Sequence, residues 1–318
     1  MAPASRPHYD DELERAPGRL PALLGVEHLE LLVAEPVPVS DPRPFIDGRP
    51  IEHREYRVPG PAGAPELTIS VFQRTDHATP GGAVYFTHGG GMITGDRFAS
   101  LDRHIDWVER FDLVFVAVEY RLAPHHPYPT PIDDCYAGLV WAVEHAAELG
   151  FDPTRLVIMG QSAGGGLAAG TALLARDRGT PALAGQMLLC PMLDDRDATV
   201  STHQFADGGR WDREQNRYGW TAYLGSRRGG PDVDIYAAPA RADDLSGLPP
   251  TYIDVGSAEV FRDEDVAYAT AIWASGGDAE LHVYPGGFHG FEVVAPEIAI
   301  SRACIDARER WLQRILAV

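Results

Sequence analysis

The stretch from Val157 to Gly164, VIMGQSAG, decides the fold, because an apolar run ends there in the pattern G-x-S-x-G and continues into small residues. This order predicts a strand, a sharp turn and a helix, with Ser162 at the tip of the turn. A serine in such a turn adopts a strained backbone conformation that exposes its hydroxyl. Glycine is needed at Gly160 and Gly164, since a side chain at either position would collide with the strand or the helix. The pattern alone also fits an ordinary strand-to-helix turn, so the rest of the chain has to decide.

Two further segments favour a nucleophilic role for Ser162. Upstream, a strand-like run at residues 83–87 leads into the sequence HGGG at residues 88–91, a glycine loop whose backbone N–H groups can bind an oxyanion. Downstream, the acid candidate Glu259 precedes His289, which lies in the sequence GFHG. The order serine, acid, histidine is that of the α/β-hydrolase fold.

Short β-rich runs alternate with helical stretches, which predicts an α/β fold with a mostly parallel eight-stranded sheet and helices on both faces. The expected strands are residues 55–58, 67–73, 83–87, 113–119, 156–159, 186–190, 251–255 and 280–284, and the first two are expected to form an antiparallel edge. Apolar periodicity predicts helices at residues 133–149, 163–176, 264–274 and 298–315. The candidate site residues then follow the carboxyl ends of strands, where open α/β sheets place their sites.

Four motifs together resemble the hormone-sensitive-lipase-like (family IV) carboxylesterases of the α/β-hydrolase fold. They are HGGG at 88–91, YRLAP at 120–124, GQSAGG at 160–165 and FHGF at 288–291, in the family's order along most of the chain. Residues 191–250, between two expected strands, are too long for a structureless loop and predict a folded lid. The resemblance implies a single domain over residues 1–318 with a helical cap formed by about residues 1–45 and 195–240.

The sequence departs from the family's usual motifs at three places. Met92 stands where an aromatic residue often follows the glycine loop, and Gln161 stands where an acidic residue is common. The usual acid motif begins with Asp-Pro, whereas this chain has Glu259 followed by valine. The first two departures affect the pocket and the loop, and the third leaves the identity of the acid open.

The acid candidates after the strand that ends at Val255 are Asp254, Glu259, Asp263 and Asp265. The acid of this fold lies in the loop just past the strand, and this position favours Glu259. Asp263 falls where a helix should begin, which suits an N-cap or a first-turn carboxylate. In the resembling family the acid opens the motif, and this again selects Glu259.

The expected chemistry is acyl transfer. Serine is a weak nucleophile unless a base stands beside it, and that base needs a third group to hold its tautomer. Ser162 is therefore expected to attack an ester carbonyl, His289 to move the proton, and Glu259 to orient the imidazole. His88 is expected to brace the glycine loop, and Arg121 is expected to be structural.

The expected oxyanion hole consists of the backbone N–H groups of Gly90, Gly91 and Ala163. Bulky residues near the site predict an apolar pocket closed at one end, and acyl chains of about C2 to C6 should fit it best. The expected pocket residues are Met92, Ile93, Trp211 and Phe288.

Composition excludes several other kinds of chemistry. The net charge of −19 argues against nucleic acid and anionic membranes as partners and favours neutral or cationic ligands, although a solvated acidic surface explains it as well. All 27 basic residues are arginine, and a chain without lysine has no Walker-type phosphate loop, Schiff-base lysine or Ser-Lys dyad. No histidine pair with metal-ligand spacing and no close cysteine pair occurs, so neither a metal nor a cofactor is expected.

Three widely spaced cysteines, Cys135, Cys190 and Cys304, suit a reducing compartment. The N-terminus has no apolar signal segment, and a cytoplasmic protein is therefore expected. The last strand, residues 280–284, is a candidate sheet edge that could pair in a homodimer. The helix at Asp133 and Asp134 is expected to have these residues as its N-cap.

Two classes of function fit these patterns. The first is a serine carboxylesterase acting on small-molecule short-chain esters, with amidase or deacetylase activity as variants. The second is a non-catalytic ligand-binding relative, since one fold serves several functions. A nucleotide-binding glycine motif at residues 164–169 is excluded by its register, because its first glycine already lies in the expected helix.

Overall fold

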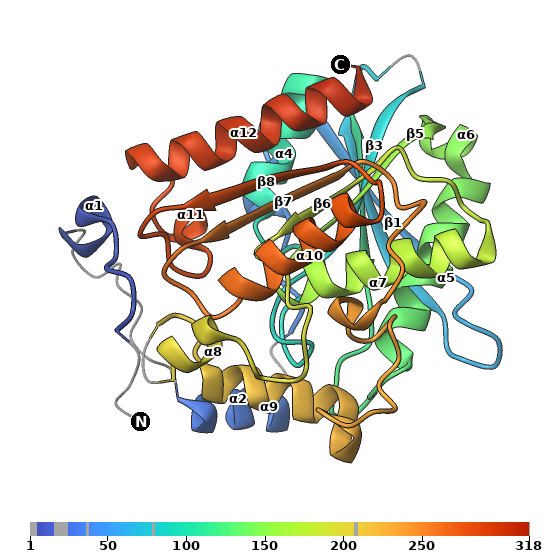
Figure 1. The fold of residues 1–318 in the computed structure, drawn as a ribbon. Helices are drawn as coiled ribbons and strands as arrows, with labels where there is room; N and C mark the ends of the chain where they lie inside the picture. Colours follow the sequence, from blue (N-terminus) through green and yellow to red (C-terminus); the bar gives the residue numbers. More distant parts are fainter. Residues whose placement is uncertain (1–4, 16–24, 36–37, 78–79, 207–208, 318) are drawn as a thin grey trace.

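The computed structural model describes residues 5–15, 25–35, 38–77, 80–206 and 209–317, and its core is one twisted sheet (Figure 1). The sheet has eight strands in the order β1-β2-β4-β3-β5-β6-β7-β8. β2 runs antiparallel to both of its neighbours, and all other neighbouring pairs are parallel. The strands are β1 Ile51–Val58, β2 Leu67–Arg74, β3 Gly81–Thr87, β4 Val114–Glu119, β5 Phe151–Gln161, β6 Gly185–Leu189, β7 Thr251–Gly256 and β8 Ala279–Tyr284.

Each of the eight predicted strands is present, and so is the antiparallel edge. The largest error in a boundary concerns β5, which begins at Phe151 and not at residue 156. Its first residues include Asp152 and Pro153, so they lack the apolar pattern on which the prediction relied. Their place in the sheet is instead set by pairing between Gly81 and Phe151.

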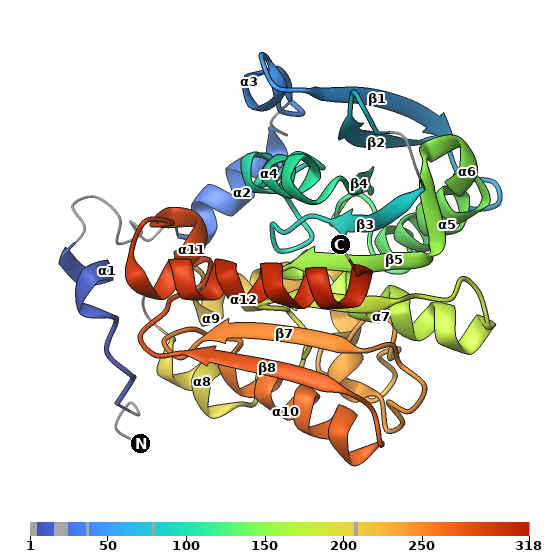
Figure 2. The same cartoon turned by 90° about the horizontal axis from the view of Figure 1, so that it is seen from above.

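Helices cover both faces of the sheet, as predicted. α5, α7 and α10 bury side chains such as Leu139, Leu167 and Ile272 against one face. α4 and α12 bury Ile105 and Trp311 against the other (Figures 1 and 2). These helices are α4 Leu101–Phe111, α5 Thr130–Glu144, α7 Ala163–Arg178, α10 Arg262–Ala274 and α12 Ala299–Leu316, and α6 Ala146–Leu149 follows α5.

Two details of the helix prediction were wrong. α4 was not predicted, although Leu101, Ile105 and Val108 recur at helical spacing. The predicted N-cap at Asp133 and Asp134 is also incorrect, because α5 begins at Thr130. Asp134 is fully buried inside the helix and forms a bidentate ion pair with Arg121, which gives Arg121 the predicted structural role.

Short helices gather at the end of the sheet where the carboxyl ends of the parallel strands lie. α2 (Val26–Ala34) lies beside α9 (Arg213–Leu224), although the two are far apart in the chain (Figure 1). Parts of the predicted cap, residues 1–4, 16–24, 36–37 and 207–208, lie outside the described residues. The other short elements are α1 Asp11–Arg15, α3 Arg43–Ile46, α8 Val200–Gln204, η1 Gly225–Arg227, η2 Pro239–Arg241 and α11 Phe291–Val294.

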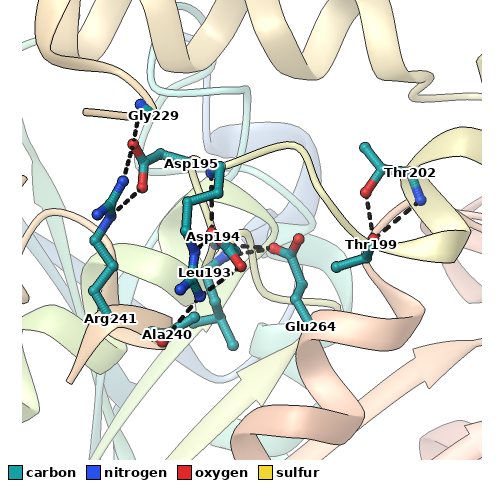
Figure 3. Close-up of polar contacts among 10 residues, drawn as sticks. Leu193, Asp194, Asp195, Thr199, Thr202, Gly229, Ala240, Arg241 and Glu264 are labelled. Atoms are coloured by element: carbon teal, nitrogen blue, oxygen red, sulfur yellow. Dashed lines mark hydrogen bonds and ion pairs between the residues drawn. The ribbon is translucent and has the colours of Figure 1, made fainter. Parts of the chain in front are cut away.

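Buried carboxylates fix the segment that carries α8 and α9 to the sheet domain (Figure 3). Glu264 of α10 accepts hydrogen bonds from the backbone N–H groups of Leu193 and Asp194, at 2.7 and 3.2 Å. The next residue, Asp195, forms a bidentate ion pair with Arg241 at the far end of the same segment, at 2.5 and 3.0 Å. The two ends of residues 191–250 are therefore held together beside the first turn of α10.

Candidate active site

Ser162 lies at the turn between β5 and α7 in a strained conformation, with φ of 57° and ψ of −124°. Positive φ is unusual for a residue with a side chain, and such strain occurs mainly at functional sites. A Cβ at Gly160 would lie 2.1 Å from the carbonyl oxygen of Gly164, and one at Gly164 would lie 2.1 Å from that of Thr87. The glycines are therefore a steric requirement of this turn, as the sequence pattern predicts.

Three loops bring Ser162, His289 and Glu259 together. The Nε2 atom of His289 lies 2.9 Å from the Ser162 hydroxyl, and its Nδ1 atom lies 2.8 Å from Oε2 of Glu259. A carboxylate can only accept a hydrogen bond, so Nδ1 donates to Glu259 and Nε2 is left to accept from the serine. The three residues follow β5, β7 and β8, whose parallel carboxyl ends meet at one edge of the sheet.

Glu259 is 2% exposed, and burial raises its pKa while the neighbouring His289 offsets part of this effect. The other acid candidates have different surroundings. Asp254 forms a buried bidentate ion pair with Arg308 at 2.6 and 2.9 Å, and Asp263 accepts from the backbone N–H of Ser201 at 2.7 Å. Among the four candidates for the acid, the one in contact with His289 is Glu259.

The expected oxyanion hole consists of the backbone N–H groups of Gly90, Gly91 and Ala163, and Gly90 and Gly91 line the cavity at Ser162. None of the three donates a hydrogen bond to another residue in the part of the chain that the structure describes. Gly90 and Gly91 have φ of 122° and 63°, values that residues with a side chain rarely adopt. Three unpaired donors beside a serine hydroxyl can bind the negative oxygen of a tetrahedral adduct.

His88 braces the glycine loop, as predicted. Its ring is fully buried, stacks on Tyr120 with centroids 4.2 Å apart, and bonds through Nδ1 to the carbonyl oxygen of Gly89 at 2.8 Å. The Tyr120 hydroxyl donates to the His88 carbonyl oxygen at 2.7 Å. Burial lowers the pKa of His88, which keeps the ring neutral and rigid.

A cavity of about 700 Å³ opens at Ser162, and we call it the Ser162 cavity. Its lining contains Trp211 from the predicted pocket set, but not Met92, Ile93 or Phe288. Met92 has φ of 65° and is fully buried in the core, and Ile93 faces a neighbouring cavity of about 560 Å³. Phe288 packs edge-on against Tyr9, with ring centroids 5.8 Å apart. Sequence proximity to the glycine loop and to His289 was therefore a poor guide to the lining.

Helix α2, the start of α9 and the segment just before α9 supply lining residues that the sequence prediction missed. The side chains concerned are His28, Leu29, Leu32, Arg210 and Gln215. α9 also packs directly on the glycine loop, since a Cβ at Gly219 would lie 2.8 Å from the Gly91 carbonyl oxygen. The ring of Trp211 occupies the space that a side chain at Gly91 would need. No local sequence signal identifies these contacts, because they join segments that are distant in the chain.

Comparison with known proteins agrees with this geometry. A family model described as the alpha/beta hydrolase fold matches residues 84–293. Carboxylesterase NlhH of Mycobacterium tuberculosis is 40% identical over 230 residues, which cover 68% of this chain and 69% of that protein. Esterase LipI of the same species is 34% identical over 282 residues, covering 84% and 83%. A solved bacterial heroin esterase is 39% identical with a TM-score of 0.86 and coverage of 97% and 98%.

The chain belongs to the α/β-hydrolase family. The resemblance to the hormone-sensitive-lipase-like carboxylesterases of this family is thereby confirmed, and the chain is a hydrolase. Gln161 stands where the family often has an acidic residue, and its side-chain amide donates a hydrogen bond to the carboxylate of Glu292 at 3.3 Å. Burial opposes ionisation of Glu292, but the charges of Arg308 and Arg103 outweigh burial and lower its pKa.

One group of side chains in the described part of this α/β-hydrolase has the spacing of a metal site. It consists of Cys190, Glu259 and His289, whose ligand atoms lie within 4.8 Å of one another. Both ring nitrogens of His289 already contact Glu259 and Ser162, and burial raises the pKa of the Cys190 thiol, which keeps it protonated. The grouping is therefore explained by the Ser162, His289 and Glu259 contacts.

None of the described helices has the length and apolar character needed to cross a bilayer.

Proposed function

We propose that this α/β-hydrolase is a serine carboxylesterase that hydrolyses short-chain acyl esters through an acyl-enzyme. The observation that carries the proposal is the hydrogen-bonded chain from Ser162 through His289 to Glu259, at 2.9 and 2.8 Å, beside three unpaired backbone donors. Relatives that carry the names carboxylesterase and esterase support the same activity.

In the acylation step, His289 Nε2 takes the Ser162 hydroxyl proton while Oγ attacks the ester carbonyl carbon. The carbonyl oxygen becomes an anion and accepts hydrogen bonds from the N–H groups of Gly90, Gly91 and Ala163. Glu259 stabilises the imidazolium through Nδ1–H. When the carbon–oxygen bond to the alcohol breaks, His289 Nε2 returns its proton to the leaving oxygen, and Ser162 keeps the acyl group.

In the deacylation step, water takes the place of the alcohol. His289 Nε2 removes a proton from this water, whose oxygen attacks the acyl carbon of the serine ester. The second tetrahedral adduct uses the same three N–H donors. It breaks at the Ser162 oxygen, which recovers its proton from His289, and the carboxylic acid leaves.

We propose a preference for short acyl chains. The Ser162 cavity has a volume of about 700 Å³, and its lining includes the bulky apolar side chains of Leu29, Leu32 and Trp211. We expect p-nitrophenyl esters of about C2 to C6 to be hydrolysed fastest. Faster hydrolysis of the C16 ester than of the C4 ester would contradict this preference.

Replacing Ser162 by alanine tests the proposal against the non-catalytic alternative. Ser162→Ala should abolish ester hydrolysis and leave the melting temperature close to that of the wild type, because the hydroxyl contributes chemistry and not core packing. A variant that kept more than a few per cent of the turnover would remove Ser162 from its role. Amidase and deacetylase activities use the same acyl-enzyme, and a panel of matched anilides and acetylated sugars would detect them.

We further propose a single domain with a cap formed by α2, α8 and α9, and a homodimer that pairs through β8. This strand is one of the two edges of the sheet and carries Val283, an exposed apolar side chain. A Val283→Arg variant should lower the molar mass measured by light scattering from dimer to monomer.

We also propose a cytoplasmic location, since Cys135, Cys190 and Cys304 are buried free thiols, and cell fractionation would test it.

A further inference from the structure

The Ser162 cavity has a charge character opposite to that of the chain. The sequence has 46 acidic residues against 27 arginines, and its net charge is −19. Nevertheless, no aspartate or glutamate occurs among the described residues that line this cavity. The lining instead contains two histidines, the amides of Gln161 and Gln215, and the guanidinium of Arg210. Behind this lining Glu259 faces His289, but the charged side chain on the cavity wall itself is the cation Arg210.

The described residues occupy only part of the hydrogen-bonding capacity of Arg210. Its side chain is exposed, and its Nη1 atom makes one long bond, 3.3 Å, to the carbonyl oxygen of Gly290. Within the described ranges, no carboxylate forms an ion pair with Arg210. Its neighbour Arg213 differs, because it is paired with Asp197 at 2.9 Å. A guanidinium carries five N–H donors in a planar fork that matches a carboxylate, and Arg210 leaves most of them free.

The position of Arg210 indicates which part of an ester it would meet. Gly290 directly follows His289, so the guanidinium lies on the histidine side of Ser162. The leaving oxygen of an ester must face Nε2 of His289, since it receives its proton from that atom. The carbonyl oxygen must face Gly90 and Gly91 on the other side. Arg210 therefore borders the space for the alcohol portion.

We propose that Arg210 is a specificity-determining residue that binds a carboxylate on the alcohol portion of the ester. The preferred substrates are then short-chain acyl esters of hydroxy acids or of phenols that bear a carboxylate. This inference rests on the proposed carboxylesterase function and adds a substrate class to it. The acidic residues elsewhere on the surface repel such an anion weakly, because screening limits their repulsion to about 8 Å at physiological salt.

The test uses two acetate esters that differ in one charge, 3-carboxyphenyl acetate and the neutral 3-carbamoylphenyl acetate, with phenyl acetate as the reference. Each kcat/KM is divided by the rate constant for hydroxide hydrolysis of the same ester, which corrects for leaving-group reactivity. At about 0.15 M salt, the wild-type ratio of carboxy to carbamoyl ester should be roughly tenfold. This ratio should decline as salt increases, since the attraction is electrostatic.

Variants assign the ratio to Arg210. Arg210→Gln should bring the ratio to about one, and Arg210→Lys should keep part of it, because a point charge remains without the bidentate fork. Arg57→Gln is the matched control: it removes one positive charge from an exposed position on β1, far from the site, and should leave the ratio unchanged. Circular dichroism checks that each variant is folded.

The outcomes separate the two proposals. If the wild type does not hydrolyse phenyl acetate, the proposed esterase function fails. If it hydrolyses phenyl acetate but the corrected ratio is one or less, the inference about Arg210 is overturned and the esterase function stands. The inference also fails if folded Arg210→Gln keeps the wild-type ratio. Should Arg210→Gln not fold, the salt dependence of the wild-type ratio decides, and a ratio that salt does not change contradicts the inference.

Discussion

The loop after β7 and the first turn of α10 lie next to each other in the chain, yet their buried carboxylates have different partners. Glu259 in the loop and Glu264 in the helix are 2% and 4% exposed, and burial raises the pKa of both. Glu259 contacts the ring of His289, whereas Glu264 accepts from the backbone N–H groups of Leu193 and Asp194. Burial and a shifted pKa therefore do not distinguish the proposed catalytic acid from a structural carboxylate. The atom that each carboxylate contacts does.

The two aspartates in the first turn of α10, like Glu264, have no contact with His289 among the described residues. Asp263 accepts from the backbone N–H of Ser201 at 2.7 Å and pairs with Arg262 at 2.7 Å. Asp265 is fully buried, and neither of its oxygens has a hydrogen-bond partner among the described residues. The loop carboxylate thus contacts His289, and we propose that it serves the reaction, whereas Glu264 and Asp263 in the helix turn hold residues 191–250. Substitutions in the loop and in the helix turn should therefore have different effects.

The largest expected effect is the loss of activity in Glu259→Gln. The amide cannot accept from Nδ1–H as a carboxylate does, so the imidazole loses its orienting charge and its preferred tautomer. We expect kcat/KM for p-nitrophenyl butyrate to fall by roughly three to four orders of magnitude. The urea midpoint should change little. Asp263→Asn, as the matched control, should retain most of the activity, and the reverse pattern would assign the acid to Asp263.

The next effect is a loss of stability in Glu264→Ala. This change leaves two buried backbone donors without a partner, and we expect a cost of about 2–4 kcal/mol in the free energy of unfolding. Glu264→Gln keeps an acceptor in place and should lose much less. Equilibrium urea denaturation of both variants measures the difference. Equal stabilities for the alanine and glutamine variants would show that the contact to residues 193 and 194 contributes little.

A smaller loss of stability is expected for Asp263→Asn. Asp263 is partly exposed, so solvent screens its pairing with Arg262. Most of its contribution to the free energy of unfolding should therefore come from the hydrogen bond with the Ser201 N–H. We expect a cost of about 1 kcal/mol. The melting temperature from calorimetry provides the measurement. A variant with normal stability and no activity would instead place Asp263 in the reaction.

The last prediction concerns how stability changes with pH, and not stability at one pH, and it involves Asp265. Burial, and then the charge of Glu264, raise the pKa of Asp265 well above its ordinary value of 3.8. The folded protein therefore keeps a proton that the unfolded chain releases, and this group makes stability fall as pH rises above about 4. Asp265→Asn has no such proton and should reduce the fall by up to about 1.4 kcal/mol per pH unit. Urea denaturation between pH 5 and about 8 tests this slope, and parallel curves for both proteins would contradict it.

Much of the fold could be predicted because its signals are local. The strand runs and the glycines around Ser162 are determined by neighbouring residues, and their steric demands hold in the structure. The proximity of Ser162, Glu259 and His289 could also be predicted, because each residue follows the carboxyl end of a strand. The choice of Glu259 over Asp263 used its position in the loop after β7 and the order of the acid motif in the resembling family.

The cavity lining could not be predicted in the same way. Leu29 and Leu32 reach the cavity from α2, and this contact depends on how α2 packs against α9. Met92 was assigned to the pocket because it follows the glycine loop, but its φ of 65° goes with a side chain buried in the core. Asp134 was taken for a helix cap because Arg121, its ion-pair partner, was not known to lie beside it. Tertiary contacts of this kind leave no periodic pattern in the sequence.

The most direct measurement for the central claim is labelling with a fluorophosphonate, followed by mass spectrometry of the modified peptide. We expect one modification, on Ser162, which disappears in Ser162→Ala and is much slower in Glu259→Gln, while Glu264→Gln labels at the wild-type rate. Modification of another residue, or unchanged labelling in Glu259→Gln, would contradict the assignment of Ser162, His289 and Glu259 as the site of reaction.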